Sequence, residues 1–317
     1  MKCLVTGGAG FIGSTLVDRL LAEEHEVDVI DDLSTGSLGN LASARAEGGK
    51  GFRFHQADIR AGEVVEVIER VRPEVVFHLA AQADVRVSVA RPVFDAEVNI
   101  IGSLNVLEGA RAGGASKVVF ASSGGTIYGD PPPEALPIKE SQAQAPLSPY
   151  GVAKKTVGDY LRAYRELHDL EFTALALANV YGPRQDPHGE AGVVAIFAER
   201  LLAGETCKVF GTGEQTRDFV FVDDVVDAFA RAAERAGGLL LNIGTGVETS
   251  VNQLYQAMAA DVGRTGKPEY EEARPGELAR SSLDPAKASI HLGWKPWTSL
   301  EDGLAAVSRW YQERVEG

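Results

Sequence analysis

The stretch "LVTGGAGFIGSTL", residues 4–16, decides the fold of this chain. It continues a short apolar run, residues 2–6, which predicts a β-strand. Apolar residues at helical spacing predict a helix over residues 12–23, and a second apolar run predicts a strand over 27–31. A strand, a glycine turn, a helix and a strand within about 30 residues make a β-α-β unit, from which parallel sheets are built.

The turn of this unit carries three glycines, Gly7, Gly10 and Gly13, at the spacing G-x-x-G-x-x-G. Glycine permits a tight turn, close approach of the backbone to a pyrophosphate, and close contact between helix and strand. The start of the helix also offers N–H groups and a positive dipole end to phosphates. A tight turn without a ligand is the alternative, but the agreement of strand, glycines, helix and second strand predicts a dinucleotide site.

Two carboxylates at strand ends are candidates for holding the adenosine. Asp31 ends the second strand, where it can accept hydrogen bonds from a ribose diol and would repel a 2′-phosphate, so NAD is favoured over NADP. Asp58 ends a predicted strand over 52–59. It is expected either to receive the adenine amino group or to act as a helix N-cap.

Short apolar strands and helices continue to alternate along the chain. Further strands are predicted over 74–81, 117–123 and 171–180, and helices over 61–71, 93–112 and 148–168. This alternation predicts an α/β fold with a doubly wound parallel (Rossmann) sheet covered by helices on both faces. Ligands in such sheets bind at the carboxyl ends of the strands.

The composition of the sequence changes after residue 180, where Gly, Pro and charged residues are frequent. We therefore expect an NAD-binding domain of residues 1–178, to which residues 217–245 return. A smaller, chiefly C-terminal substrate domain is expected to comprise residues 179–216 and 246–317.

Composition limits the class of partner. The net charge is −14 and no basic stripe is present, so nucleic acid is not an expected partner. The two cysteines, Cys3 and Cys207, lie far apart, as is usual in a reducing compartment. No apolar stretch reaches the roughly 18–20 residues that span a bilayer, and the N-terminus has no signal-peptide layout. The expectation is a cytoplasmic protein without a membrane partner.

"SPYGVAKKTVGDY", residues 148–160, places Tyr150 and Lys154 four positions apart within a predicted helix. Residues at i and i+4 share a helix face. The lysine ammonium can then lower the pKa of the phenol from about 10, as a nicotinamide cation would, and the lysine can hold the nicotinamide ribose. The pair is common by chance, and it gains weight from its combination with the nucleotide motif.

Several motifs now occur together, and together they resemble the extended short-chain dehydrogenase/reductase family over residues 1–317. Within that family the sequence is most similar to the UDP-glucose 4-epimerase group. The motifs that carry the resemblance are TGGAGFIG (6–13), Asp31, HLAA (78–81), Tyr150-x-x-x-Lys154, NVYGPR (179–184) and RDFVFVDD (217–224).

The resemblance implies an NAD-dependent reaction without net redox change. Tyr150 would take the proton of the sugar 4-hydroxyl, C4 would give hydride to NAD, and hydride would return to the other face of the 4-keto sugar. Besides Tyr150 and Lys154, the implied cofactor-binding residues are Gly7, Gly10, Phe11, Ile12, Gly13, Asp31, Asp32, Ser34, Thr35, Gly36, Asp58, Ile59, Leu79, Ala80, Ala81 and Asn99.

The stretch "ASSGGTIYGD", residues 121–130, is expected to be a strand end opening into a glycine-rich loop. The family usually carries a Ser or Thr at the position of Gly124 to bind the 4-hydroxyl. Ser123 and Thr126 are the candidates for that role here, Thr126 slightly ahead, unless they merely cap the strand end. Related dehydratases and decarboxylases carry acids where this chain has Gly125 and Thr126, which favours epimerisation.

The resemblance also implies the substrate side, for a UDP-sugar. Arg217 and Arg274 are expected at the diphosphate or the ribose, and arginine suits phosphate recognition. Asn179 is expected at the diphosphate, and Val193 is expected to line the site. Ser281 falls where a bulky residue would exclude N-acetyl groups, so UDP-GlcNAc as well as UDP-glucose is expected to fit.

Other interpretations remain open on the sequence alone. A nucleotide-sugar dehydratase, decarboxylase or reductase, or a UDP-glucuronate 4-epimerase, would share these motifs, and a non-enzymatic NAD-binding protein is a further alternative. Asp186, His188 and Glu190 have poor spacing for a metal site, and no metal is expected. The family usually forms dimers through two long helices, here 93–112 and 148–168, so a homodimer is expected.

Overall fold

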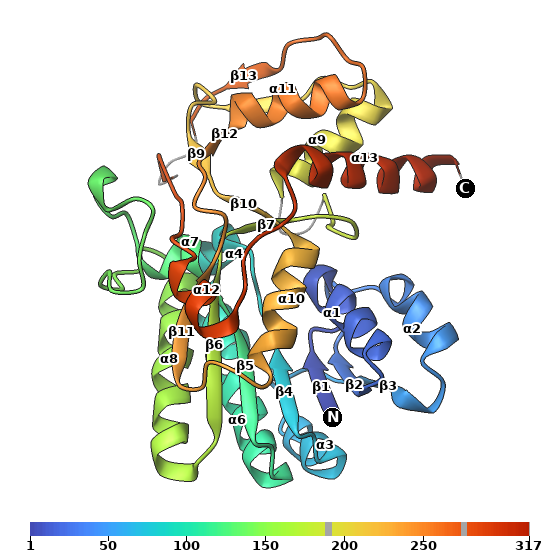
Figure 1. Cartoon of the computed structure of the whole chain (residues 1–317), viewed down its shortest axis with the longest axis vertical. Helices are drawn as coiled ribbons and strands as arrows, with labels where there is room; N and C mark the ends of the chain where they lie inside the picture. The colour runs from blue at the N-terminus through green and yellow to red at the C-terminus, as the bar shows by residue number, and fades with distance from the viewer. Residues whose placement is uncertain (188–191, 274–277, 317) are drawn as a thin grey trace.

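A computed structural model describes residues 1–187, 192–273 and 278–316 (Figure 1). Its centre is a seven-stranded sheet in which every neighbouring pair is parallel, in the order β11-β6-β5-β4-β1-β2-β3. The predicted fold class, a doubly wound parallel sheet, is confirmed. The strands are β1 (Lys2–Thr6), β2 (Glu26–Asp31), β3 (Phe52–Gln56), β4 (Val75–His78), β5 (Lys117–Ser123), β6 (Glu171–Leu177) and β11 (Leu239–Ile243).

Alternate residues of the strands build two hydrophobic cores, one on each face of the sheet. Val5 and Val29 belong to the core under α1 (Phe11–Ala22) and α10 (Val222–Ala232). Leu4 and Ile30, their neighbours in sequence, belong to the opposite core. Helices α3 (Glu63–Val71), α6 (Gly102–Gly113) and α8 (Pro149–His168) supply the other side of that second core. This is why the strands are apolar on both faces rather than alternating.

Short strands and several helices form a smaller half beyond the sheet, in the upper part of Figure 1. Three strand pairs occur there: β7 (Asn179–Tyr181) with β10 (Phe219–Phe221), β8 (Lys208–Phe210) with β13 (Glu269–Glu271), and β9 (Thr216–Arg217) with β12 (Thr249–Ser250). The other helices of the described chain are α2 (Ala42–Glu47), α4 (Val85–Ala90), α5 (Pro92–Ala96), α7 (Gly124–Ile127), α9 (Val193–Ala203), α11 (Val251–Asp261), α12 (Ala286–Leu292) and α13 (Leu300–Glu316), with short 3₁₀ turns at 38–41, 49–51 and 133–135.

Residues 239–243 leave the smaller half and return to the sheet as β11, its edge strand beside β6. Helix α10, just before them, packs against α1. The exact division of the chain at residue 178 stays a prediction.

Two element predictions were wrong in detail. The predicted helix over 93–112 is α5 followed by a π-helical segment, η3 (Glu97–Ile101), and then α6. The glycine-rich stretch 121–130 is not an open loop. Strand β5 runs to Ser123 and the short helix α7 follows at once, so Gly124 and Gly125 are the first two residues of this helix.

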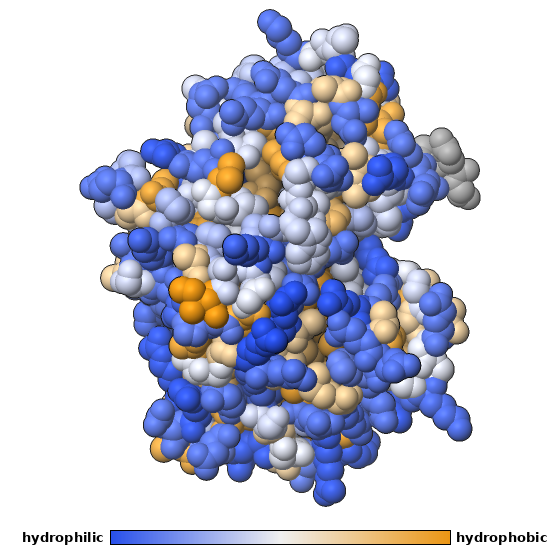
Figure 2. Space-filling view, in the orientation of Figure 1, coloured by the Kyte–Doolittle hydropathy of each residue, from blue (hydrophilic) through white to orange (hydrophobic). Residues whose placement is uncertain are grey.

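In the space-filling view, the face shown is covered mostly by hydrophilic residues, and the hydrophobic ones gather in small patches (Figure 2). None of the helices in the described ranges is long and apolar enough to cross a bilayer.

Candidate active site

The glycine turn lies at the carboxyl end of β1, against the segment that follows β4. Gly7 has φ +70°, and a Cβ there would lie 2.7 Å from the Ala80 nitrogen. A Cβ on Gly13 would overlap the carbonyl oxygen of Gly7, so α1 can lie this close to β1 only with glycine at 13. Gly10 is the helix N-cap and has no side chain that could accept the first N–H groups of α1. The N–H groups of Phe11 and Ile12 therefore suit a pyrophosphate, and the turn fits a dinucleotide.

Asp31 connects the end of β2 to this turn. Its carboxylate accepts hydrogen bonds from the backbone N–H groups of Ala9 (2.9 Å) and Leu33 (2.8 Å). Only 7% of Asp31 is exposed, and burial raises its pKa. Asp32 beside it accepts hydrogen bonds from the N–H and the hydroxyl of Ser34. The loop from Leu33 through Thr35 to Gly36 thus closes around Asp31, which fits the predicted ribose position.

The Asp58 carboxylate is paired with Arg60 and does not cap a helix. Its Oδ1 accepts the Arg60 N–H at 2.9 Å, and the Arg60 guanidinium pairs with both carboxylate oxygens and lowers the Asp58 pKa. The alternative prediction, that Asp58 caps a helix, was wrong: α3 begins at Glu63 and its N-cap is Gly62. Ile59, next to Asp58, is buried.

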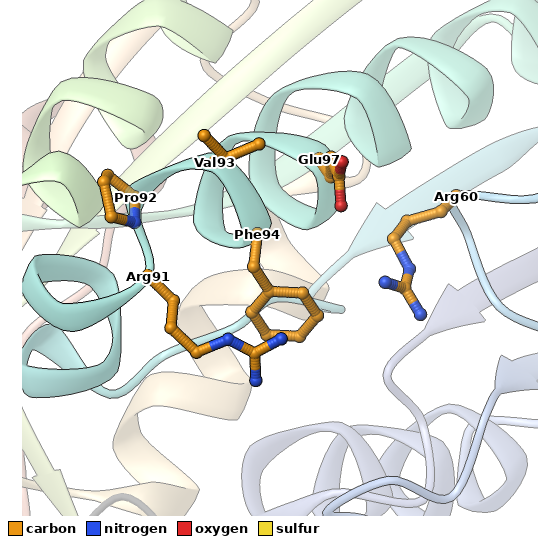
Figure 3. A pocket seen from close by; sticks show the side chains of 6 residues that line it. All are labelled: Arg60, Arg91, Pro92, Val93, Phe94 and Glu97. Atoms are coloured by element: carbon orange, nitrogen blue, oxygen red, sulfur yellow. The ribbon is translucent and has the colours of Figure 1, made fainter.

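Arg60 also lines a surface pocket (Figure 3). The guanidinium groups of Arg91 and Arg60 flank the Phe94 ring, 4.3 and 5.3 Å from its centroid. Neither Tyr150 nor Lys154 lines this pocket, so the chemistry is placed at the strand ends instead.

His78 supports the segment Leu79–Ala81, which follows β4. The Ser103 hydroxyl donates to the Asn99 carbonyl oxygen (2.6 Å), so it accepts from His78 Nε2 (2.8 Å). Nδ1 then accepts from the Thr6 hydroxyl (2.7 Å), and the Thr6 oxygen accepts from the Ala80 N–H (3.3 Å). Burial is the main cause that lowers the His78 pKa to about 3, so this histidine is neutral.

Asn99 lies behind the same segment and is 98% buried, with 2% exposed. Its side-chain amide accepts from the Gln82 N–H and donates to the Gln82 carbonyl oxygen and to Asp95, each at 2.9 Å. Asn99 therefore orders the backbone that follows β4 from within. Gln82 and Asp95 were missed at the sequence level. The only local signal was the i,i+4 spacing of Asp95 and Asn99 on the predicted helix.

Tyr150 and Lys154 stand at the carboxyl end of β5. Helix α8 begins there because the Ser148 side chain accepts the Gly151 N–H and Pro149 occupies the first helical position. Lys154, 4% exposed, donates to the Ala121 carbonyl oxygen at 2.9 Å. Its Nζ is 5.6 Å from the centroid of the Tyr150 ring.

Ser123 and Thr126 flank Gly124 at the junction of β5 and α7. The Thr126 hydroxyl donates to the Ser123 carbonyl oxygen over a long 3.5 Å, and the Ser123 side chain does not cap α7. Both side chains are half-buried. The Thr126 bond reaches the last carbonyl of β5 and is a contact of the strand-end capping kind, so the choice between capping and a role at the 4-hydroxyl stays a prediction.

The predicted substrate residues lie on several elements of the smaller half. Arg217, half-buried on β9, donates to the carbonyl oxygens of Thr216 (2.8 Å) and Leu278 (2.9 Å). Asn179 begins β7 and is exposed, Val193 begins α9, and Ser281 is 5% exposed. Arg274 lies outside the described residues, as do His188 and Glu190. Within the described ranges no group of three or more metal-ligand side chains occurs.

Comparison with known proteins shows similarity to epimerases along the whole chain. The model of the NAD dependent epimerase/dehydratase family matches residues 3–244. A UDP-glucose 4-epimerase of Mycolicibacterium smegmatis is 52% identical over 317 residues, which are 100% of both chains. The crystal structure of a UDP-glucose 4-epimerase with UDP-glucose from Thermotoga maritima has a TM-score of 0.95 and 45% identity, over 99% of this chain and 100% of that one. The Thermus thermophilus UDP-glucose 4-epimerase in complex with NAD has a TM-score of 0.91 and 42% identity, over 98% of this chain and 99% of that one.

Proposed function

Because the chain belongs to the NAD dependent epimerase/dehydratase family, we propose that it interconverts UDP-hexoses that differ at C4. The enzyme is an NAD-dependent isomerase of the UDP-glucose 4-epimerase type. The observation that carries this function is the full-length 52% identity to an epimerase in a chain whose Tyr150 and Lys154 meet at the end of β5.

Bound NAD supplies a hydride acceptor that takes hydride from C4 of the sugar and returns it to the other face. Tyr150 acts as the base that takes the proton of the 4-hydroxyl and later gives it back. The Lys154 ammonium, fixed by the Ala121 carbonyl, favours the phenolate of Tyr150 electrostatically. A hydroxyl from Ser123 or Thr126 holds the sugar oxygen, and both side chains are near enough to the end of β5 for this role.

The same strand end disfavours elimination of water. A dehydratase needs a proton donor for the departing hydroxyl, and the positions where its relatives carry acids are Gly125 and Thr126. Neither residue has a carboxyl group. Epimerisation needs no such donor, because no carbon–oxygen bond is broken.

The UDP-sugar is held by the smaller half. Arg217 and Arg274 provide positive charge for the diphosphate of the substrate, although the net charge of the chain is −14, and Asn179 and Val193 contribute to the same substrate site. Ser281 faces the C2 substituent, and its small side chain leaves room for an N-acetyl group.

The spectrum of the purified enzyme tests the reaction class. UDP-glucose or UDP-galactose should reduce enzyme-held NAD transiently, with absorbance near 340 nm, and should interconvert without added cofactor. Loss of water from the sugar, or stoichiometric consumption of added NADH, would contradict an epimerase. A panel of UDP-sugars then tests Ser281: turnover of UDP-galactose without turnover of UDP-GalNAc would overturn the proposed room at C2.

We further propose that the enzyme works in the cytoplasm as a homodimer. Cys3 and Cys207 are both buried free thiols, with pKa values raised by burial to about 12 and about 11. Apolar side chains are exposed on α4, α5, η3 and α8, which pack on one another: Val89, Val93, Ile101 and Val152 at 63, 72, 51 and 47%. Exposed apolar side chains on neighbouring helices suit contact with a second copy of the chain.

A further inference from the structure

Residues 281–284 of the smaller half, here called the sugar-side segment, are fixed to the large half by backbone hydrogen bonds. Ile138 donates to the Ser282 carbonyl oxygen, and Asp284 donates to the Ile138 carbonyl oxygen, both at 2.8 Å. These bonds make a parallel bridge between Ile138 and Leu283. Because each bond holds the main chain, the position of Leu283 does not depend on a flexible side chain.

Asp218 anchors the same segment from the other side. This carboxylate is 1% exposed and accepts the Leu283 N–H (3.1 Å), the Gly246 N–H (3.0 Å), and the N–H and hydroxyl of Thr245 (2.8 and 2.6 Å). Asp218 follows Arg217 directly. The buried Asp218 carboxylate therefore connects Arg217, the predicted phosphate-binding residue, with the sugar-side segment. Four donors compensate the burial of this carboxylate.

The Leu283 side chain reaches into the large half, where it packs with Ile127, Tyr128, Ile138 and Ala176. It is 1% exposed. Tyr128 in turn donates to Asn242 on β11 at 2.8 Å, so the wall around Leu283 is itself fixed. The leucine therefore has no free space into which it could withdraw.

Gly124 lies directly against this side chain. A Cβ at position 124 would overlap Leu283 Cδ1 and would lie 3.0 Å from Cδ2 and 3.2 Å from the Ala176 carbonyl oxygen. The space that a side chain at 124 would need is thus already filled from the smaller half. Ser123 and Thr126, the two candidate hydroxyl donors, stand on either side of Gly124.

We propose that Leu283 is a positioning residue, which sets the sugar-side segment against the end of β5, and that Gly124 is the glycine that makes room for it. The contact fixes Ser281, expected at the sugar C2 substituent, relative to Ser123 and Thr126, expected at the 4-hydroxyl. The hydroxyl missing at 124 is then a consequence of the leucine at 283, and the two positions can change only together. This inference rests on the proposed function for its catalytic part alone.

A double-mutant cycle tests the packing without any assay of turnover. Gly124→Ser should lower the thermal midpoint by about 3–6 °C, because it overpacks a filled site. In Leu283→Ala the same serine should cost less than about 1 °C, because the cavity accepts it. Equal costs of Gly124→Ser in both backgrounds would overturn the proposal, whether or not the protein is an epimerase.

The kinetic arm asks whether Leu283 positions the sugar. Leu283→Ala should lower kcat for UDP-galactose at least tenfold while inhibition by UDP, which lacks the hexose, changes less than twofold. Leu241→Ala is the matched control, since Leu241 is also fully buried but belongs to the core on one face of the sheet. Equal kcat losses in the two leucine variants, or a parallel loss of UDP binding, would reduce Leu283 to a general packing residue. Absence of turnover in the unaltered protein would instead contradict the proposed function.

Discussion

Lys154 shows how a single buried charge can be tolerated at a strand end. Its ammonium is 4% exposed but donates to the Ala121 carbonyl oxygen and lies 4.8 Å from the centroid of the Phe120 ring. A carbonyl and a ring face both stabilise a cation without neutralising it. These contacts suit a positive charge close to Tyr150, whose ring centroid lies 5.6 Å from the Lys154 Nζ.

Replacement of Tyr150 by Phe should lower kcat by at least about a thousandfold, because the ring is kept and the base is lost. The variant should still purify with NAD, as the glycine turn and Asp31 are untouched. Absorbance of the released cofactor and a turnover assay measure the two effects. Substantial remaining activity would contradict the assignment of the base.

His78 should make stability depend on pH. Its pKa in the folded protein, about 3, is below the usual 6.5, so the unfolded chain binds more protons between these values. The contribution of His78 to stability is then fully present above pH 6.5. Below this pH the free energy of unfolding falls by up to about 1.4 kcal/mol per pH unit. Urea unfolding at pH 7.5, 6.0 and 5.0 should show a steeper loss for the natural protein than for His78→Gln. Parallel losses would mean that His78 is charged or exposed.

The glycine turn and α1 act as one element, because the close approach of Gly13 to Gly7 sets where the helix begins. Gly13→Ala would force the helix away from β1. Urea unfolding should show a loss of about 1–3 kcal/mol, as for overpacking elsewhere, and the purified protein should contain little NAD. Gly158→Ala is a comparison for the general effect of losing a glycine, since Gly158 also lies within a helix, α8, and nothing lies within 4 Å of a Cβ there. Normal NAD content in Gly13→Ala would mean that the turn is not the phosphate site.

The helix that precedes β5 explains why some site residues escape sequence reasoning. A regular 3.6-residue pattern predicted one helix, but residues 97–101 are π-helical, and Asn99 in this segment bonds to Gln82 and Asp95. π-Helical turns are frequent at functional sites, yet their widened turn leaves no mark in hydrophobic periodicity. The cofactor-side network was therefore found only in the structure.

The sequence correctly predicted the elements that carry the candidate site, because these depend on neighbours along the chain, while the roles of the residues stay predictions. The glycine turn, Asp31 and the Tyr150–Lys154 pair are each local patterns on one strand, turn or helix. Asp218 and Leu283 could not be predicted in the same way, because they meet across 65 residues and their roles depend on how the two halves pack. The strand end was wrongly predicted to be an open loop for the same reason. The space beside Gly124 is filled by the side chain of Leu283, which is distant in the sequence.

The whole molecule offers an apolar surface around Val93 that suits a second copy. Val93→Glu should change the protein from a dimer to a monomer of 33.7 kDa, because a charge would be buried in the contact. Ile290→Glu is the control, as Ile290 is 77% exposed on α12, away from this surface. Sedimentation equilibrium distinguishes the two masses. A Val93→Glu protein that remains dimeric would exclude this surface as the contact.

The return of residues 239–243 to the sheet has a consequence for how such a protein can change by descent. A recombination event that replaced everything from residue 179 onward would remove the seventh strand and helix α10 together with the sugar-binding parts. The incoming piece would need an edge that pairs with β6 and a helix that fits α1. Exchange of this part of the chain as one module would therefore disturb the central sheet as well as the predicted substrate side.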